Sequence, residues 1–145
     1  MLRDSLSKMY NRLRLLHYRE LFGRIREHAG SLSATEAFAL DVVYLLGNPT
    51  VTQLADELGV SQPNATYKVN SLASKGYINK TVSDVDKRMC RLSVSDRFFK
   101  YYDDRGEFID KVINSLSSKF TPEQLSTFEK ILDTIADIQN NSEAE

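Results

Sequence analysis

The chain has 145 residues, of which 41% are hydrophobic and 27% charged, and its formal net charge is −1 at pH 7. This composition is that of an ordinary globular protein, and the net charge excludes a grossly basic nucleic-acid-binding chain. No apolar run reaches the roughly 18 residues that a membrane span requires, and the N-terminal stretch does not match a signal peptide. With a single cysteine, Cys90, no internal disulfide can form, so we expect a cytoplasmic protein without a membrane partner.

The charges are distributed in blocks along the chain. Residues 1–28 hold seven basic and three acidic residues, and residues 61–91 hold six basic and two acidic ones. Residues 92–145 hold six basic and eleven acidic residues. The basic block at 61–91 matters for function only if its side chains share a surface that can meet phosphate.

The N-terminal segment is predicted to form an amphipathic helix that reaches to about His28. Its apolar residues recur at helical spacing, with Arg and Lys between them. These apolar residues are Leu2, Leu6, Met9, Leu13, Leu16 and Leu21. Ala29 and Gly30 then end the helix.

A second helix is predicted to begin at Ser33, because residues 33–36 (Ser-Ala-Thr-Glu) have the pattern of a capping box. The Ser hydroxyl can accept a hydrogen bond from the amide of Glu36. The predicted apolar face of this helix consists of Phe38, Val42, Leu45 and Leu46. Residues 47–49 (Gly-Asn-Pro) end the helix.

Two short helices follow. Residues 50–53 (Thr-Val-Thr-Gln) form a second capping box, which starts a helix through Leu58. Gly59 suits the left-handed turn at the end of that helix. Ser61 then caps the next helix, which Gly76 ends.

The period of the apolar residues then changes from 3.6 to 2. Residues 77–82 and 89–94 are predicted to form two short strands, and the polar residues 83–88 form the tip of their hairpin. After Ser95 we expect one long helix that runs to about Lys119.

A last helix is predicted after a third capping box at residues 121–124 (Thr-Pro-Glu-Gln). Its apolar residues are Leu125, Phe128, Leu132, Ile135 and Ile138. Their spacing resembles a short coiled-coil seam. The predicted fold class is therefore mainly α with a small β-hairpin.

Two short helices joined at Gly59 and followed by a basic hairpin indicate a winged helix-turn-helix. Ala55 is small where the two helices cross, and Val60 fills the gap between them. The helix capped by Ser61 is then the recognition helix, whose Gln and Asn side chains can bond adenine edges and whose Lys can meet guanine or phosphate. The candidate DNA-contacting residues on this helix are Ser61, Gln62, Asn64, Thr66, Tyr67, Lys68 and Ser71.

The stretch from Ser33 to Ser95 resembles the MarR family of bacterial regulators. The matching segments are residues 32–36, 54–63, 72–78, 83–88 and 92–95. The candidate DNA-contacting residues of the wing are Asp86, Lys87 and Arg88. The resemblance implies that Asp86 and Arg88 form a pair and that Arg88 enters a DNA minor groove, which an Arg suits.

This sequence departs from the family's pattern at three places. The family usually has an Arg where Tyr67 lies and an apolar residue where Lys68 lies. The run after the second strand, Val94 to Phe98, lacks the Gly that relatives usually have there.

The resemblance also implies an organisation for the whole chain. We expect a single MarR-like domain over 1–145, with dimerisation helices at 1–30 and 105–140 and a DNA-binding region at 33–95. The first and last helices leave apolar faces that a two-fold homodimer would cover. Such a dimer would place two recognition helices about 34 Å apart, which fits a palindromic operator in double-stranded DNA.

MarR-like proteins are mostly repressors that release DNA when a small ligand binds. A small-molecule effector is therefore expected here too, with Phe22, Phe38, Tyr44 and Tyr102 as candidate pocket residues. The alternative function is a winged-helix protein-interaction module without DNA binding.

Neither an enzyme nor a metal protein is predicted. The sequence has no Gly-rich phosphate loop, nucleophile motif or paired catalytic carboxylates, so no enzymatic activity and no cofactor are expected. His17 and His28 lie about 16 Å apart along one helix, too far to share a metal ion. Cys90 can be read as a redox sensor or as a small half-buried strand residue, and we favour the second reading.

Overall fold

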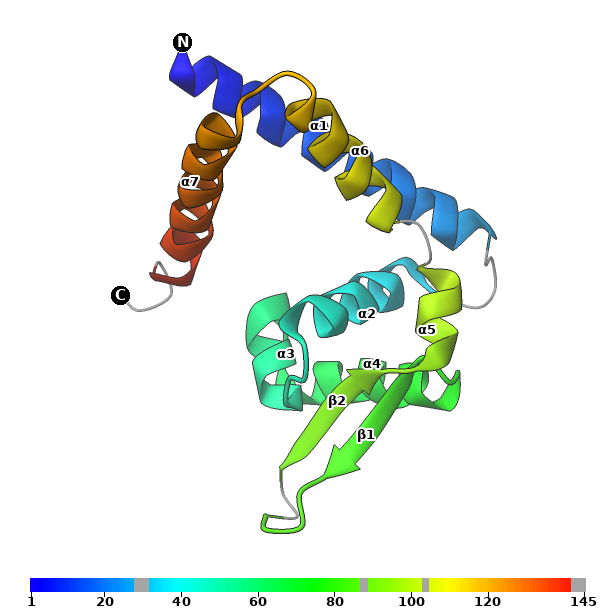
Figure 1. Cartoon of the computed structure of the whole chain (residues 1–145). Coiled ribbons are helices and arrows are strands. Elements are labelled where there is room, and N and C mark those ends of the chain that lie inside the picture. Colours follow the sequence, from blue (N-terminus) through cyan, green and yellow to red (C-terminus); the bar gives the residue numbers. More distant parts are fainter. Residues whose placement is uncertain (28–31, 87–88, 103–104, 142–145) are drawn as a thin grey trace. The chain divides into compact units, whose positions relative to one another are not determined.

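The computed structural model describes residues 1–27, 32–86, 89–102 and 105–141 (Figure 1). The chain divides into two compact units, Met1–Tyr101 and Tyr102–Glu145. The first unit contains α1 (Leu2–Glu27), α2 (Ala34–Leu46), α3 (Val51–Leu58), α4 (Gln62–Ser74), β1 (Ile78–Val82), β2 (Cys90–Val94) and α5 (Asp96–Tyr101). The second unit contains α6 (Arg105–Ser117) and α7 (Pro122–Asn141). No helix in the described ranges is long and apolar enough to cross a membrane.

The core of the first unit lies between α2, α3, α4, the hairpin and α5. Its largest fully buried side chains are Leu21, Leu40, Val43, Leu54, Val69, Leu72, Tyr77, Leu92 and Phe98. Burial of these side chains is the main favourable term that holds the helices against the hairpin.

The hairpin is a two-stranded antiparallel sheet that projects beyond α3 and α4 (Figure 1). Its register pairs Ile78 with Val94 and Val82 with Cys90. The middle of β2 is attached to the segment before α3, because the amide of Leu92 donates to the carbonyl of Pro49 at 2.8 Å. An isolated bridge between Thr50 and Arg91 extends this attachment.

The predicted helix starts are confirmed by their hydrogen bonds. At the start of α3, Thr50 and Gln53 form both halves of a capping box, at 3.2 and 2.9 Å. At the start of α7, Thr121 and Gln124 do the same, at 3.3 and 3.0 Å. Ser33 accepts from the amide of Glu36 at the start of α2, at 3.2 Å. These contacts satisfy backbone amides that have no partner within the helix.

The predicted apolar face of α2 is wrong. The structure buries Ala37, Ala39, Leu40 and Val43, whereas Phe38, Leu45 and Leu46 are exposed in the single chain. The reason is that α2 is apolar on nearly all sides, so periodicity alone did not separate the face toward the core from the opposite one.

The single long helix predicted after Ser95 is also wrong, because the structure has two helices there, α5 and α6. The apolar spacing continues across both helices, which is why one helix was expected. Asp103, Asp104 and Gly106 lie at this point in the sequence, and Asp and Gly are among the weaker helix formers.

Candidate nucleic-acid interface

The turn between α3 and α4 has the backbone geometry of a helix-turn-helix. Gly59 has a φ of 65° in the left-handed region, and its amide donates to the carbonyl of Asp56 at 3.2 Å. The amide of Val60 donates to the carbonyl of Ala55 at 3.1 Å. This pair of hydrogen bonds is the Schellman motif, which a glycine in the left-handed conformation makes without strain. Ala55, 3% exposed, lies at the helix crossing as predicted.

The start of α4 is fixed by Ser61. Its hydroxyl accepts from the amide of Asn64 at 3.3 Å, and Pro63 lies in the first turn. The hydroxyl of Ser61 therefore serves the helix itself. The N-terminal turn of α4 is exposed. Pro63 has no N–H, and the amides of Asn64 and Ala65 donate to Ser61, so the amide of Gln62 is the group of this turn that suits a phosphate oxygen.

The outer face of α4 carries most of the predicted contact residues. Ala65, Val69 and Leu72 are buried and define the inner face. The exposed predicted residues are Gln62, Asn64, Thr66 and Tyr67. Lys68 and Ser71 are half-buried. By helical periodicity Tyr67 lies opposite the buried stripe, while Gln62 and Thr66 lie on one flank and Lys68 on the other.

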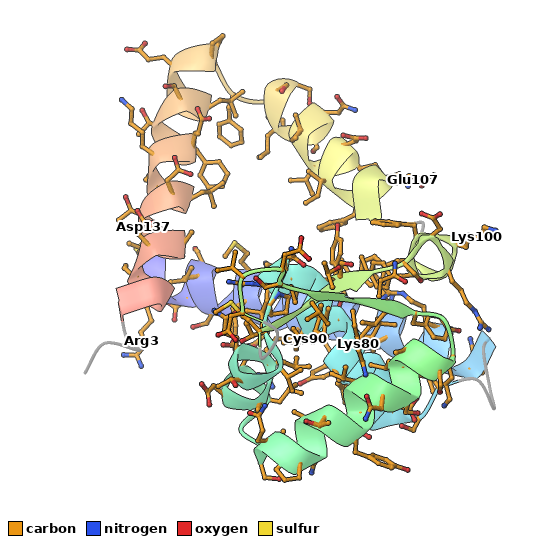
Figure 2. The ribbon with its side chains drawn as sticks, turned by 90° about the horizontal axis from the view of Figure 1, so that it is seen from below. Arg3, Lys80, Cys90, Lys100, Glu107 and Asp137 are labelled. Atoms are coloured by element: carbon orange, nitrogen blue, oxygen red, sulfur yellow. The ribbon has the colours of Figure 1, made fainter. Side chains whose placement is uncertain are left out.

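Three lysines connect α4 with neighbouring elements. Lys68 donates to the hydroxyl of Thr35 in α2 at 3.3 Å, and Lys75 forms an ion pair with Glu36 at 2.8 Å. Lys80 of β1 donates to the side-chain oxygen of Asn70, and Figure 2 labels Lys80 on the strand beside α4. These contacts place positive charge along both flanks of α4.

The wing is ordered by Ser83. Its hydroxyl accepts from the amides of Val85 and Asp86, each at 3.3 Å. The carbonyl of Asp86 accepts from the amide of Met89 at 2.9 Å. Asp86 is exposed on the wing. Lys87 and Arg88 lie outside the described residues, so the predicted Asp86–Arg88 pair stays a prediction.

A groove of about 370 Å³ separates the wing from α4. It is lined by Thr50, Val51, Thr52, Gln62, Thr66, Asp86, Met89 and Cys90. Sequence reasoning placed Gln62, Thr66 and Asp86 in the interface but missed Thr50 and Thr52, which the fold brings to the groove from the start of α3. Their position at a capped helix start was the signal that could have found them. Cys90 is half-buried, as expected.

The residues predicted to line an effector pocket differ in exposure. Phe22 on α1 is 63% exposed, and Tyr102 is buried, 7% exposed. Phe38 and Tyr44 on α2 are exposed. The ring of Tyr44 packs on that of Phe98 with 5.0 Å between ring centres.

Of the two histidines, the structure describes His17. His17 on α1 lies 4.0 Å from the carboxylate of Asp41, which is buried in α2. His28 lies outside the described residues. Within the parts of the chain that the structure describes, no group of three or more His, Cys, Asp or Glu could hold a metal ion.

Residues 31–89 match the model of the MarR family. Among solved structures, the chain is similar to FabT of Streptococcus pneumoniae in complex with DNA, at 18% identity, covering 97% of this chain and 96% of that one, with a TM-score of 0.60. It is similar to a MepR mutant from a multidrug-resistant clinical isolate of S. aureus, at 14% identity, covering 92% and 96%, with a TM-score of 0.67. It is similar to a MarR mutant from E. coli complexed with operator DNA, at 17% identity, covering 90% and 92%, with a TM-score of 0.52. The search of curated proteins found no match.

The geometry of α3, α4 and the hairpin defines a winged helix-turn-helix protein. Residues 31–89 match the model of the MarR family, and the whole chain has the fold of solved MarR-family regulators. That family consists of transcription regulators and is not a class of enzymes.

Proposed function

We propose that the chain is a sequence-specific DNA-binding transcriptional regulator. The observation that carries the proposal is the exposed polar face of α4 beside a projecting hairpin, with a groove between them. A helix of this kind fits the major groove of B-DNA, and a basic hairpin at its side fits the adjacent minor groove. The similar FabT and MarR-mutant structures were solved with DNA, which supports the same use of the fold here.

The groove beside α4 supports a specific course for the DNA backbone. When α4 lies in the major groove and the wing in the minor groove, one sugar-phosphate strand must pass between them. The groove between α4 and the wing has Thr50 and Thr52 at the start of α3 along its side. Helix-start amides and Thr hydroxyls bind phosphate oxygens, so these residues would set the position of the protein on the duplex.

Selection of duplexes from a random pool tests this function. The wild type is expected to enrich one pseudo-palindrome with half-sites about ten base pairs apart, and added salt should weaken binding because phosphate contacts release counterions. Arg88→Ala should weaken binding and relax sequence preference at the positions under the wing, because Arg is the residue best suited to a narrow minor groove. Lys111→Ala on α6, which removes one exposed charge from the second unit, is the matched control.

The alternative function gives a different result in the same experiment. A winged-helix module that binds only a protein partner would enrich no DNA sequence, and it would show no salt-dependent binding to DNA. That outcome would contradict the DNA-binding proposal while leaving the fold unchanged.

We propose that the regulator is a homodimer. In the second unit, α6, α7 and the segment between them expose apolar side chains that two helices alone cannot cover. These are Ile109, Val112, Ile113, Phe120, Phe128, Ile131, Leu132, Ile135 and Ile138. In the first unit, α1 exposes Leu2, Leu6, Met9, Leu13 and Leu15. Apolar surfaces of this extent mark interaction sites in soluble proteins.

A second copy of the chain is the occupant that the charges favour. The segment of α1 is basic and residues 92–145 are acidic, so the two ends of the chain attract one another between copies. The second unit also has an apolar cavity of about 270 Å³, lined by Leu116, Phe120, Gln124, Leu125 and Phe128, which a partner's apolar side chain would fill. A two-fold pair also matches the symmetry of a palindromic site.

Ile135→Lys should convert the dimer into a monomer, because it places a charge in the middle of the apolar face of α7. Sedimentation equilibrium measures the change. Asp133→Lys introduces the same side chain on the opposite side of the same helix and should leave the dimer intact. If the Ile135 variant stayed as dimeric as the Asp133 variant, α7 would not form the interface.

We further propose that the protein acts as a repressor whose DNA affinity falls when a small aromatic or acidic ligand binds. The support is the resemblance to ligand-responsive MarR-like repressors and the aromatic side chains Phe22, Phe38, Tyr44 and Tyr102. Titration of a bound operator duplex with aromatic acids tests this part of the proposal, which fails if no compound changes the affinity.

A further inference from the structure

The C-terminal end of α4 has a cap of its own. Gly76 has a φ of 80°, and its amide donates to the carbonyl of Ala73 at 3.0 Å. The amide of Tyr77 donates to the carbonyl of Leu72, also at 3.0 Å. This Schellman motif satisfies carbonyls inside the last turn of the helix. The carbonyls of Lys75 and Gly76 lie beyond the turn and need partners from elsewhere.

The junction between β2 and α5 supplies those partners. The guanidinium of Arg97 donates from Nη1 to the carbonyl of Lys75, and the hydroxyl of Ser95 donates to the carbonyl of Gly76. The amide of Ser95 donates to the carbonyl of Tyr77 at 2.9 Å. We call these five residues the α4 clamp. It joins the end of the recognition helix to the start of α5 through three hydrogen bonds.

Arg97 is fixed within the clamp by more than its hydrogen bond. Its guanidinium lies over the ring of Tyr77, 4.6 Å from the ring centre, and Tyr77 is only 1% exposed. Its Cδ and Nη1 lie 3.8 and 3.9 Å from the place where a Cβ on Gly76 would be. A planar guanidinium can stack on a ring and donate to a carbonyl at the same time, which the ammonium of a lysine does less well.

We propose that Arg97 is a positioning residue for DNA reading, an inference that rests on the proposed function. Arg97 contacts Lys75, the C-cap of α4, and Tyr77, which leads into β1, so it sets the angle at which the recognition helix leaves the core. Lys75 is held from the other side by Glu36 in α2, at 2.8 Å. With both contacts in place, the C-terminal end of α4 has one orientation relative to α2 and α5, and the exposed side chains of α4 keep one register toward base edges.

The proposed role differs from a phosphate contact in what it does to binding. A phosphate contact strengthens binding to every sequence. It contributes about one unit to the slope of the logarithm of the binding constant against the logarithm of the salt concentration. A positioning residue acts on base contacts alone, since these require a defined helix orientation whereas phosphate contacts tolerate small shifts. Loss of Arg97 should therefore lower the preference for the operator over a scrambled duplex.

The experiment compares Arg97→Ala, Arg97→Lys and Lys100→Ala in the full-length protein. Lys100 is an exposed residue of the same short helix, labelled in Figure 2, and its replacement removes the same charge. Affinities for the selected operator and for a scrambled duplex are measured at several salt concentrations. Arg97→Ala should reduce the operator-to-scrambled ratio by roughly three- to thirtyfold with the salt slope unchanged, and Arg97→Lys should restore only part of it. Lys100→Ala should leave the ratio as in the wild type.

Amide hydrogen exchange of the DNA-free variants gives a second readout. Arg97→Ala should speed exchange at Gly76 and Tyr77 relative to the core amides of α4, while Lys100→Ala should not. Unchanged exchange would overturn the inference even if the protein binds no DNA. A different result would make Arg97 a phosphate contact instead. In that case Arg97→Ala would weaken binding to the operator and to the scrambled duplex by the same factor and make the salt dependence shallower, and Arg97→Lys would restore both. A wild type without sequence preference would contradict the proposed function, and the exchange result would still decide whether Arg97 holds α4.

Discussion

Asn64→Ala is expected to weaken binding to the selected operator by about 5- to 150-fold, the range of one good bidentate base contact. Gln62→Ala should have an effect of the same size. Both side chains are exposed in the first turns of α4, and Gln62 also lines the groove beside the wing. Each variant should accept substitutions at one or two operator positions that the wild type rejects. Fluorescence anisotropy with a set of single-substitution duplexes measures both effects.

The control for this prediction is Asn114→Ala. Asn114 is an exposed residue of α6, so the substitution removes the same side-chain amide from a helix outside the winged helix-turn-helix. It should leave operator affinity within about twofold of the wild type, as expected of a surface change away from the contact face. If Asn64→Ala and Asn114→Ala gave the same affinity and the same preferences, the outer face of α4 would not read bases.

Leu54→Ala is expected to lower the free energy of unfolding by about 2–5 kcal/mol, the usual cost of a cavity in a packed core. Leu54 is fully buried in α3, against α4, so the loss affects the two helices of the helix-turn-helix. Leu45→Ala makes the same deletion at a residue 65% exposed on α2 and should cost much less. Urea unfolding followed by circular dichroism measures the difference, at one protein concentration because a dimer's stability depends on it.

A Leu54 variant as stable as the Leu45 variant would contradict the assignment of the core. The two sites differ in exposure but not in residue type or in secondary structure, so the comparison removes the contribution of helix propensity. A lower urea concentration at the unfolding midpoint, with an unchanged dependence of the free energy of unfolding on urea concentration, would assign the effect to stability alone.

The helix starts could be predicted from the sequence because their determinants are local. The hydroxyls of Ser33, Thr50, Ser61 and Thr121 each accept from an amide three residues ahead, and a span that short is readable in the sequence. The turn at Gly59 was predictable for the same reason, since a left-handed backbone favours glycine. Together these signals placed α2, α3, α4 and α7 correctly.

The features that sequence reasoning missed depend on contacts between distant segments. The prediction that Lys68 contacts DNA stays a prediction, but the sequence did not indicate that its ammonium contacts Thr35, 33 residues earlier in the chain, on the flank toward α2. The inner face of α2 was decided by which side meets α4 and the hairpin, and both sides of that helix are apolar. Thr52 lines the groove because β2 is attached beside the start of α3. None of these follows from spacing along one segment.

The attachment of β2 to the residues before α3 makes the wing and the helix-turn-helix move as one body. Leu92 is held by Pro49, and the guanidinium of Arg91 donates to the carbonyl of Asn48 at 3.0 Å, so the hairpin cannot tilt without α3. Under the proposed function, the distance along the duplex between the bases that α4 would contact and those that the wing would contact is therefore set by the fold. We therefore expect substitutions at the wing tip to alter which minor-groove bases the protein prefers, without changing the number of base pairs between these bases and those that α4 would contact.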